Sequence, residues 1–299
     1  MDLVLNAADY YFFTPYFYPA TWSEGDIFRQ TISLLIVTNL GAFITYFVFA
    51  TLNYYFVFDH SLMKHPQFLE NQVYREFKLT VQSLPIMSIP TILLFLLELR
   101  GYSKLYDNIG EFPSGWIYLL GSIFSFLFFT DMLIYWIHRG LHHRLVYKRL
   151  HKPHHLWKIP TPFASHAFHP LDGFMQSLPY HIYPFIFPLH KAIYLGLYIV
   201  VNIWTISIHD GDFRVPQILR PFINCSAHHT DHHVFFECNY GQYFTLWDRL
   251  GGTYKHPSSF DGKGPLDYVK TLKEKKYHDD VGNGHQNASP ASATYTKTK

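Results

Sequence analysis

Residues 112–143 read FPSGWIYLLGSIFSFLFFTDMLIYWIHRGLHH, an apolar run that leads directly into a group of histidines. No side chain from Phe112 to Thr130 is acidic or basic. A transmembrane helix needs about 20 such residues to cross the hydrocarbon core of a bilayer. The stretch therefore predicts a membrane-spanning helix that carries histidines at its end.

Two similar apolar runs precede this one, Thr31 to Phe58 and Leu79 to Leu97. Both are long enough to cross a membrane. Pro85 and Pro90 interrupt the second run, which a helical bundle tolerates when neighbouring helices satisfy the freed backbone groups. We therefore predict an all-α fold, a polytopic membrane helical bundle with a cytosolic histidine-rich metal-binding cap.

The composition also favours a membrane protein. Of the 299 residues, 48% are hydrophobic and 15% are charged, and the net charge is +2. Soluble domains average about a quarter charged residues. Nucleic-acid binding needs clustered, uncompensated Lys and Arg, so we expect no nucleic-acid partner. Two cysteines are too few for a disulfide framework, whereas histidine, with 20 copies, is in clear excess.

Basic side chains are unevenly distributed around the predicted spans. Six follow the third span: Arg139, Arg144, Lys148, Arg149, Lys152 and Lys158. By the positive-inside rule that side is cytosolic, and residues 1–30 form a non-cytosolic segment. We expect the membrane-embedded domain to cover residues 31–272. The polar tail, residues 273–299, has almost nothing to bury and is predicted to be disordered.

Three histidine boxes carry the candidate chemistry. They are His138-Arg-Gly-Leu-His142-His143, His151-Lys-Pro-His154-His155 and His228-His229-Thr-Asp-His232-His233. Spacings of three and four residues bring imidazoles together at helical pitch, as metal ligation from a helix requires. A single exposed histidine is usually only a solvated side chain, but three boxes with matching spacing predict a metal site.

The number of imidazoles bears on the metal. The boxes offer more ligands than one ion can bind, which implies two ions. Neither Cys225 nor Cys238 lies in a box, so thiolate-bound sites are not expected. Imidazole alone suits Fe, Zn or Cu, and the residues leave that choice open.

The boxes also constrain the topology. If all three bind one metal pair, residues 138–155 and 228–233 lie on the same face of the membrane. The apolar region between them must then cross an even number of times. Two apolar stretches, 173–189 and 192–208, are separated only by His190 and Lys191. They predict a helical hairpin, either full-depth or re-entrant.

One carboxylate is a candidate catalytic residue. Asp131 lies seven residues before His138, on the same helix face, and an ionisable residue near the end of a span is a functional candidate. We hypothesise that Asp131 tunes His138, and the alternative is an interfacial or capping carboxylate. Similar candidates are Asp172, Asp210, Asp212, Asp231 and Asp248.

The boxes and three further motifs resemble the membrane-bound fatty acid hydroxylase and sterol desaturase superfamily, and within it the sterol C-5 desaturases. The motifs are WKIPTPFASHAFHPLDG at 157–173, IHDG at 208–211 and NYGQYFTLWDRLGG at 239–252. The resemblance implies a multi-pass enzyme of the endoplasmic reticulum with a di-iron centre. It would use O2 to convert lathosterol into 7-dehydrocholesterol in cholesterol biosynthesis. Electrons would come from NAD(P)H through a separate reductase and cytochrome b5.

The resemblance also implies a set of metal ligands. Carried over residue by residue, it comprises His138, His142, His143, His151, His154, His155, His229, His232 and His233, with His228 beside them. The superfamily has an additional histidine between the second and third boxes, and His209 matches its place. Phe213 stands four residues later, where some members have another histidine. His143 either binds metal or orients its neighbours.

Two alternatives stay open. One is another oxidase of the superfamily, a sterol C-4 methyl oxidase or a fatty acyl hydroxylase, although the motifs at 165–173 and 239–252 favour C-5 desaturation. The other is a histidine-rich metal transporter. Transporters place their ionisable ligands near mid-membrane between broken helices, whereas the box histidines lie outside the long apolar runs.

Overall fold

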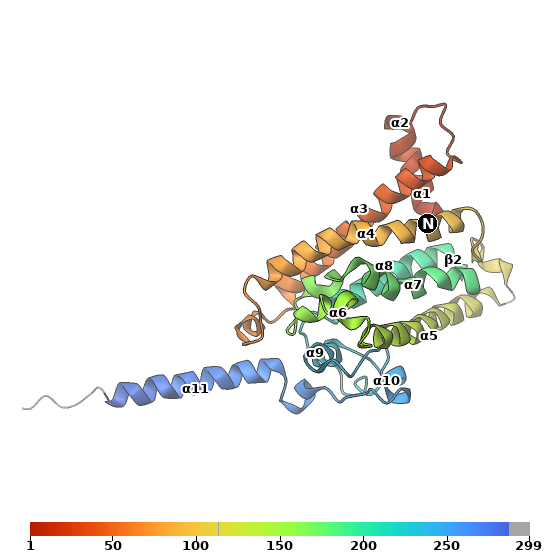
Figure 1. Cartoon of the computed structure of the whole chain (residues 1–299). Coiled ribbons are helices and arrows are strands. Elements are labelled where there is room, and N and C mark those ends of the chain that lie inside the picture. The colour runs from red at the N-terminus through yellow and green to blue at the C-terminus, as the bar shows by residue number, and fades with distance from the viewer. Residues whose placement is uncertain (113, 287–299) are drawn as a thin grey trace, which may run out of the picture.

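Three long helices dominate the computed structural model, which describes residues 1–112 and 114–286 (Figure 1). They are α3 (Ile27–Phe56), α4 (Gln72–Leu99) and α5 (Gly115–Leu141), and all three are long and apolar enough to cross a membrane. Asp26 begins α3 by accepting hydrogen bonds from the backbone amides of Phe28 and Arg29. The prediction of a polytopic helical bundle is confirmed.

Helices α7 (Pro170–Ile186) and α8 (Lys191–Ser207) form a hairpin inside this bundle. The turn between them contains β2 (Leu189–His190), which pairs in parallel with β1 (Leu105–Tyr106) in the connection between α4 and α5. Lys104 Nζ also donates to the carbonyl of Ile186 at 2.9 Å. The hairpin thus leaves the histidine end, reaches the α4–α5 connection and returns, as an even number of crossings requires.

The helices pack in a fixed order around a core rich in aromatic residues. Helix α7 contacts both α4 and α5, and α8 contacts α3. The largest core cluster joins α5, α7 and α8 and contains Phe126, Ile134, Tyr180, Tyr183, Leu189, Tyr194, Leu197, Val201 and Tyr243. On α3, Leu40, Ile44 and Leu52 remain exposed. Such a face is suited to contact with lipid.

The N-terminal segment lies at the end of the bundle opposite the histidines. It contains α1 (Asp2–Ala8), a π-helical turn (Asp9–Phe13) and α2 (Thr14–Tyr16). The amino group of Met1 pairs with Glu98 near the end of α4, and Lys191 pairs with Asp2 at 2.7 Å. Residues 1–30 and the α7–α8 turn therefore share one side of the bundle. That this side is non-cytosolic stays a prediction.

Short helices build the cap at the histidine end. They are 3-10 helices at His60–Lys64, His154–Leu156, Pro162–His166 and Ser258–Asp261, together with α6 (Tyr147–Leu150), α9 (Ser226–Phe235) and α10 (Leu246–Leu250). A further 3-10 turn, Ile109–Glu111, lies before α5. This cap positions the histidine boxes against the ends of α5 and α8.

The C-terminal tail differs from its prediction. Helix α11 (Pro265–Gln286) runs past residue 273, so residues 273–286 are helical where composition predicts disorder. Leu272, Lys273, Glu274 and Lys275 are residue types with high helix propensity, which favours continuation of the helix that begins at Pro265. Residues 287–299 lie outside the described residues.

Candidate metal centre

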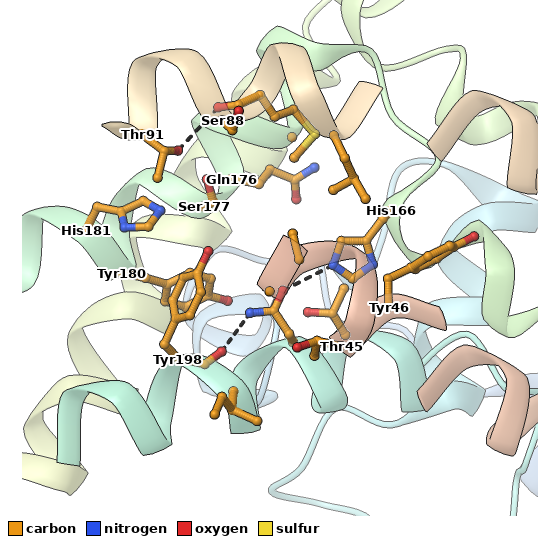
Figure 2. A pocket seen from close by; sticks show the side chains of 18 of the residues that line it. Thr45, Tyr46, Ser88, Thr91, His166, Gln176, Ser177, Tyr180, His181 and Tyr198 are labelled. Atoms are coloured by element: carbon orange, nitrogen blue, oxygen red, sulfur yellow. Dashed lines mark hydrogen bonds between the residues drawn. The ribbon is translucent and has the colours of Figure 1, made fainter. Parts of the chain in front are cut away.

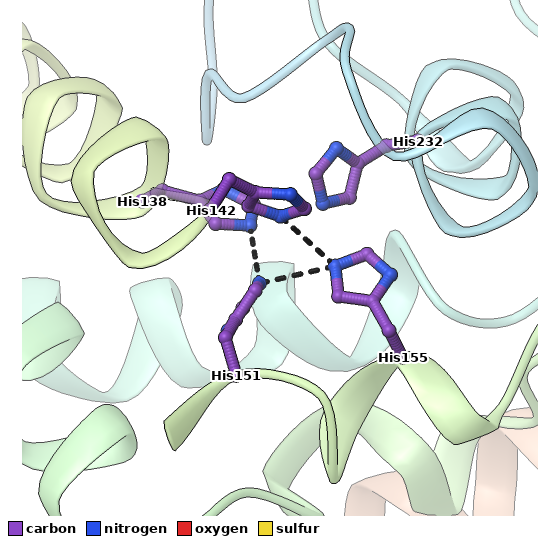
Figure 3. A group of neighbouring side chains, drawn as sticks. All are labelled: His138, His142, His151, His155 and His232. Carbon is purple, nitrogen blue, oxygen red and sulfur yellow. Dashed lines mark hydrogen bonds between the residues drawn. The ribbon is translucent and has the colours of Figure 1, made fainter. Parts of the chain in front are cut away.

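The predicted histidines converge in two groups. The first, which we call the five-histidine cluster, contains His138, His142, His151, His155 and His232 (Figure 3). The second, the four-histidine cluster, contains His154, His209, His229 and His233. Within each group the candidate ligand atoms all lie within 4.8 Å of one another. Each cluster therefore combines imidazoles from stretches of chain that are far apart in the sequence.

The boxes do not map one to one onto the clusters. His151 and His155 of the second box belong to the five-histidine cluster, whereas His154 between them belongs to the other. On α9, His229 and His233 share one face and enter the four-histidine cluster, while His232 faces the five-histidine cluster. Side chains four residues apart in a helix are rotated by about 40° about the helix axis, whereas those three apart are rotated by about 60° in the opposite sense. His233 therefore stays on the side of His229, and His232 turns away from it.

Two imidazoles of the five-histidine cluster form hydrogen bonds with residues outside the cluster. His138 Nδ1 donates to the carbonyl of Tyr240 at 3.0 Å, and His151 Nδ1 donates to the Asp172 carboxylate at 2.8 Å. A neutral imidazole carries one N–H, so both Nε2 atoms present lone pairs. These two Nε2 atoms lie 3.1 Å apart. Two lone pairs at that distance repel each other unless a cation lies between the rings.

The same arrangement recurs at two further ligands. His232 Nδ1 donates to the carbonyl of Cys238 at 2.7 Å, and its buried Nε2 has no partner among the described residues. His209 Nδ1 donates to the carbonyl of Thr205 at 2.7 Å. Outer partners of this kind set the tautomer of metal-binding histidines, with Nε2 free to bind the ion. The residues present therefore fit a pair of imidazole-bound metal ions.

Burial keeps six of the cluster histidines neutral, because it is the main cause that lowers their pKa values. The positive charge of neighbouring imidazoles adds to this effect. The pKa of His209 falls to about 3. The pKa falls well below its ordinary value for His154, His155, His229, His232 and His233. At neutral pH these imidazoles have no extra proton to release before they bind a metal.

Asp131, which we hypothesise tunes His138, makes its hydrogen bonds to another segment of the chain. Its buried carboxylate accepts hydrogen bonds from the backbone amides of Gln242, Tyr243 and Phe244, at 2.9, 2.7 and 3.2 Å. The outer partner of His138 is instead the carbonyl of Tyr240. Any influence of Asp131 on His138 therefore passes through the 240–244 segment.

A second buried carboxylate holds the same segment. Asp248 accepts from the amides of Tyr240 and Gly241, both at 2.8 Å. Together with Asp131 it satisfies five consecutive backbone N–H groups. A Cβ on Gly241 would lie 2.4 Å from Asn224 Nδ2 and 2.6 Å from the carbonyl of Phe244, so this position requires glycine. The segment is thus a rigid support for the carbonyl that orients His138.

Two predicted ligands lie outside both clusters. His143 is exposed, and its Nδ1 accepts from the backbone amide of Leu145 at 3.4 Å. His228 is buried, but its Nδ1 faces the backbone amide and the thiol of Cys225. Their sequence neighbours reach the clusters because a shift of one residue turns a helical side chain by about 100°.

A cavity of about 400 Å³ lies within the bundle, and Figure 2 shows part of its lining. The cavity opens onto the clusters. Four histidines line one end, His138, His154, His209 and His229, and Met1 lies at the other. The walls come from α3, α4, α7 and α8 and are mainly apolar, with polar side chains such as His166 and Gln176 at intervals. The sequence did not reveal this cavity, because its lining residues are scattered over distant helices.

Comparison with known proteins identifies the family. The chain is 76% identical to the lathosterol oxidase of Mus musculus and 76% identical to that of Homo sapiens, in both cases over the whole of both chains. The chain belongs to the lathosterol oxidase family. A probable Delta(7)-sterol 5(6)-desaturase of Neurospora crassa is 54% identical over 80% of this chain and 69% of its own length.

Membership of the lathosterol oxidase family agrees with a second match. The family model of the fatty acid hydroxylases matches residues 123–253, a range that contains both histidine clusters and the 240–244 segment. No solved structure matches the chain. The superfamily resemblance drawn from the boxes is thereby confirmed, and the arrangement of the two clusters describes how a member of the lathosterol oxidase family assembles its histidines.

Proposed function

We propose that this chain is a sterol C-5 desaturase that uses O2 to convert lathosterol into 7-dehydrocholesterol in the endoplasmic reticulum membrane. The observation that supports it most is the cavity. It lies between the long apolar helices α3 and α4 and the α7–α8 hairpin, and it ends on histidines of both clusters. Its volume lies in the range of small-ligand sites. A flat, apolar sterol suits such a space, and the full-length relatives are named for this substrate.

The reaction dictates the kind of centre that is needed. The hydrogens at C-5 and C-6 of lathosterol are not acidic, so a general base has no proton to remove there. Bound iron, together with O2, would supply the oxidising power for breaking these C–H bonds. The imidazole-only donor set is compatible with iron. We propose as ligands the nine histidines of the two clusters, without His143 and His228.

The residues of the chain have three tasks in this reaction. Tyr240, Asp172 and Cys238 accept the Nδ1 protons of cluster histidines and so fix the direction of each Nε2. The aromatic core around Tyr180 and Tyr183 closes the bundle beside the cavity and keeps water out. The cavity walls hold the sterol B ring at the histidine end. Placement of the ring decides whether a second hydrogen is removed or the carbon is hydroxylated.

Electrons would come from NAD(P)H through a reductase and cytochrome b5. The loop that joins the first two boxes exposes Arg144, Lys148, Arg149 and Lys152 next to the five-histidine cluster. Such a patch favours docking of an acidic protein, and the same charges also orient the protein with its histidines in the cytosol.

Sterol profiling tests the proposal. Cells that lack this protein should accumulate lathosterol, and the wild-type chain should restore 7-dehydrocholesterol while His154→Ala does not. His143→Ala is the matched control, because this exposed histidine lies outside both clusters. Accumulation of a 4-methyl sterol instead of lathosterol would point to a different oxidase of the superfamily and would contradict the proposal.

A further inference from the structure

A hydrogen-bonded pair of side chains lines the cavity near the four-histidine cluster. His166 Nε2 donates to Asn202 Oδ1 at 3.1 Å, and the Ser165 hydroxyl donates to His166 Nδ1 at 3.0 Å. Asn202 Nδ2 in turn donates to the carbonyl of Tyr198 at 2.6 Å. Both His166 and Asn202 line the cavity, and Figure 2 shows His166 beside Tyr46 at its wall.

Asn202 keeps hydrogen-bonding groups that neither His166 nor Tyr198 uses. An asparagine amide has two donor hydrogens and a carbonyl oxygen with two lone pairs. In Asn202 one hydrogen and one lone pair are used by Tyr198 and His166. One donor and one acceptor therefore remain on the same side chain, and its neighbours hold its orientation. That is the complement of a hydroxyl group, which both donates and accepts.

The position of the pair matches the chemistry of the substrate. Asn202 lies three residues before Thr205 on α8, and the carbonyl of Thr205 binds the ring of His209. The two residues are thus separated by about 4.5 Å along the helix axis. In lathosterol, three covalent bonds separate the 3β-hydroxyl oxygen from C-5, the carbon that reacts. A group that binds this hydroxyl must lie close to the histidines.

We propose that Asn202, oriented by His166, binds the 3β-hydroxyl of the sterol and thereby places the B ring at the four-histidine cluster. The inference rests on the proposed function and specifies how its substrate is recognised. The sterol side chain would then extend toward the far end of the cavity. Apolar residues line that path, among them Val37, Ala42, Leu195 and Ile199.

Several other polar groups of the cavity are less suited to this task. The hydroxyls of Thr91 and Ser177 donate to carbonyls of their own helices, so neither has a donor left for the sterol. Gln176 keeps a free donor and acceptor, but a single bond to Asp172 holds its side chain, whereas both His166 and Tyr198 hold Asn202. His181 has an unpartnered Nδ1 among the described residues. It lies nine residues beyond Asp172, the partner of His151, however, which is about 14 Å further along α7 and too far for a hydroxyl next to the reacting ring.

The test pairs a variant with a substrate analogue. The full-length chain is expressed in microsomes that lack their own sterol C-5 desaturase and is supplied with lathosterol or its 3-deoxy analogue, cholest-7-ene. For Asn202→Leu we expect kcat/KM for lathosterol to fall roughly 10- to 100-fold, as for loss of a buried hydrogen bond. For the analogue it should change less than about twofold, because no hydroxyl is present to lose a partner.

A binding measurement and two further variants complete the experiment. Labelled lathosterol should bind the purified full-length Asn202→Leu protein more weakly by a similar factor, which reports recognition independently of turnover. His166→Leu removes the donor that orients Asn202 and should reduce the preference for lathosterol to a smaller extent. Thr91→Val lies in the same cavity and should keep the wild-type preference.

The outcomes separate the two proposals. If Asn202→Leu lowers kcat/KM equally for both sterols, or leaves the preference for lathosterol over cholest-7-ene unchanged, the assignment of the hydroxyl site is wrong. The proposed desaturase function is unaffected by that result. A wild-type chain that converts neither sterol would overturn the proposed function and this inference with it.

Discussion

The two histidine clusters differ in how they are supported. In the five-histidine cluster, three rings are held by Tyr240, Asp172 and Cys238. In the four-histidine cluster the corresponding partner is the Thr205 carbonyl. The buried Nδ1 atoms of His154 and His233 have no partner among the described residues, and in the five-histidine cluster the same is true of His155. Three of the four members of the four-histidine cluster also line the cavity. The difference suggests that one cluster is built to retain its ion rigidly and the other to face the substrate.

Removing one ligand from either cluster, in separate variants, should have the largest effect on turnover and metal content. We expect His151→Ala and His229→Ala both to abolish desaturation. His229→Ala should retain less metal, because it leaves three imidazoles where His151→Ala leaves four. Total metal per chain, with zinc counted as well as iron because zinc outbinds ferrous iron at such sites, is the measurement. Equal metal retention in the two variants would show that the number of remaining imidazoles does not decide how firmly each cluster holds its ion.

Weakening an outer hydrogen bond that orients a cluster histidine should have an intermediate effect on metal affinity and activity. Asp172→Asn removes the charge that faces His151 Nδ1. Changes to such outer partners typically cost about 10- to 100-fold in metal affinity or activity. Asp231→Asn is the matched control, because this carboxylate pairs with Lys255 and Ser258 and contacts no cluster histidine. If the two variants bind metal equally well, Asp172 does not support the cluster.

Among these three kinds of change, Asp131→Asn should have the smallest effect on turnover. An amide can accept fewer of the three backbone N–H bonds than the carboxylate does, so the 240–244 segment loosens. We expect Tm to fall by roughly 3–6 °C and turnover to fall only a few-fold. Differential scanning fluorimetry and the sterol assay measure both. Full turnover and metal content would show that Asp131 does not tune His138 at all.

Part of the site followed from local spacing. The pairs His138 and His142, His151 and His155, and His229 and His233 are each four residues apart, and each pair stays within one cluster. The i, i+4 rule predicts this, because such side chains share a helix face. The rule is not sufficient, since His228 lies four residues before His232 and belongs to neither cluster.

The hydrogen-bond partners that orient the histidines could not be predicted from the spacing of residues in the sequence. Asp131 lies two turns before His138 on α5, yet it binds a segment more than a hundred residues later in the chain. The supports at Tyr240, Cys238 and Thr205 are backbone carbonyls, which every residue has and which no motif distinguishes. The helix α11 was likewise missed, because its polar composition resembles that of a disordered tail.

The amino-acid sequence alone determined the three spans, the histidine boxes and the even number of crossings between them. Each of these depends on counting residues against a fixed length or helical pitch. The tertiary structure alone decided which histidines share an ion site, which groups orient them, and where the cavity meets the clusters. These features depend on the packing of α7 and α8 against α3, α4 and α5, and contacts between distant segments leave no periodic pattern in the chain.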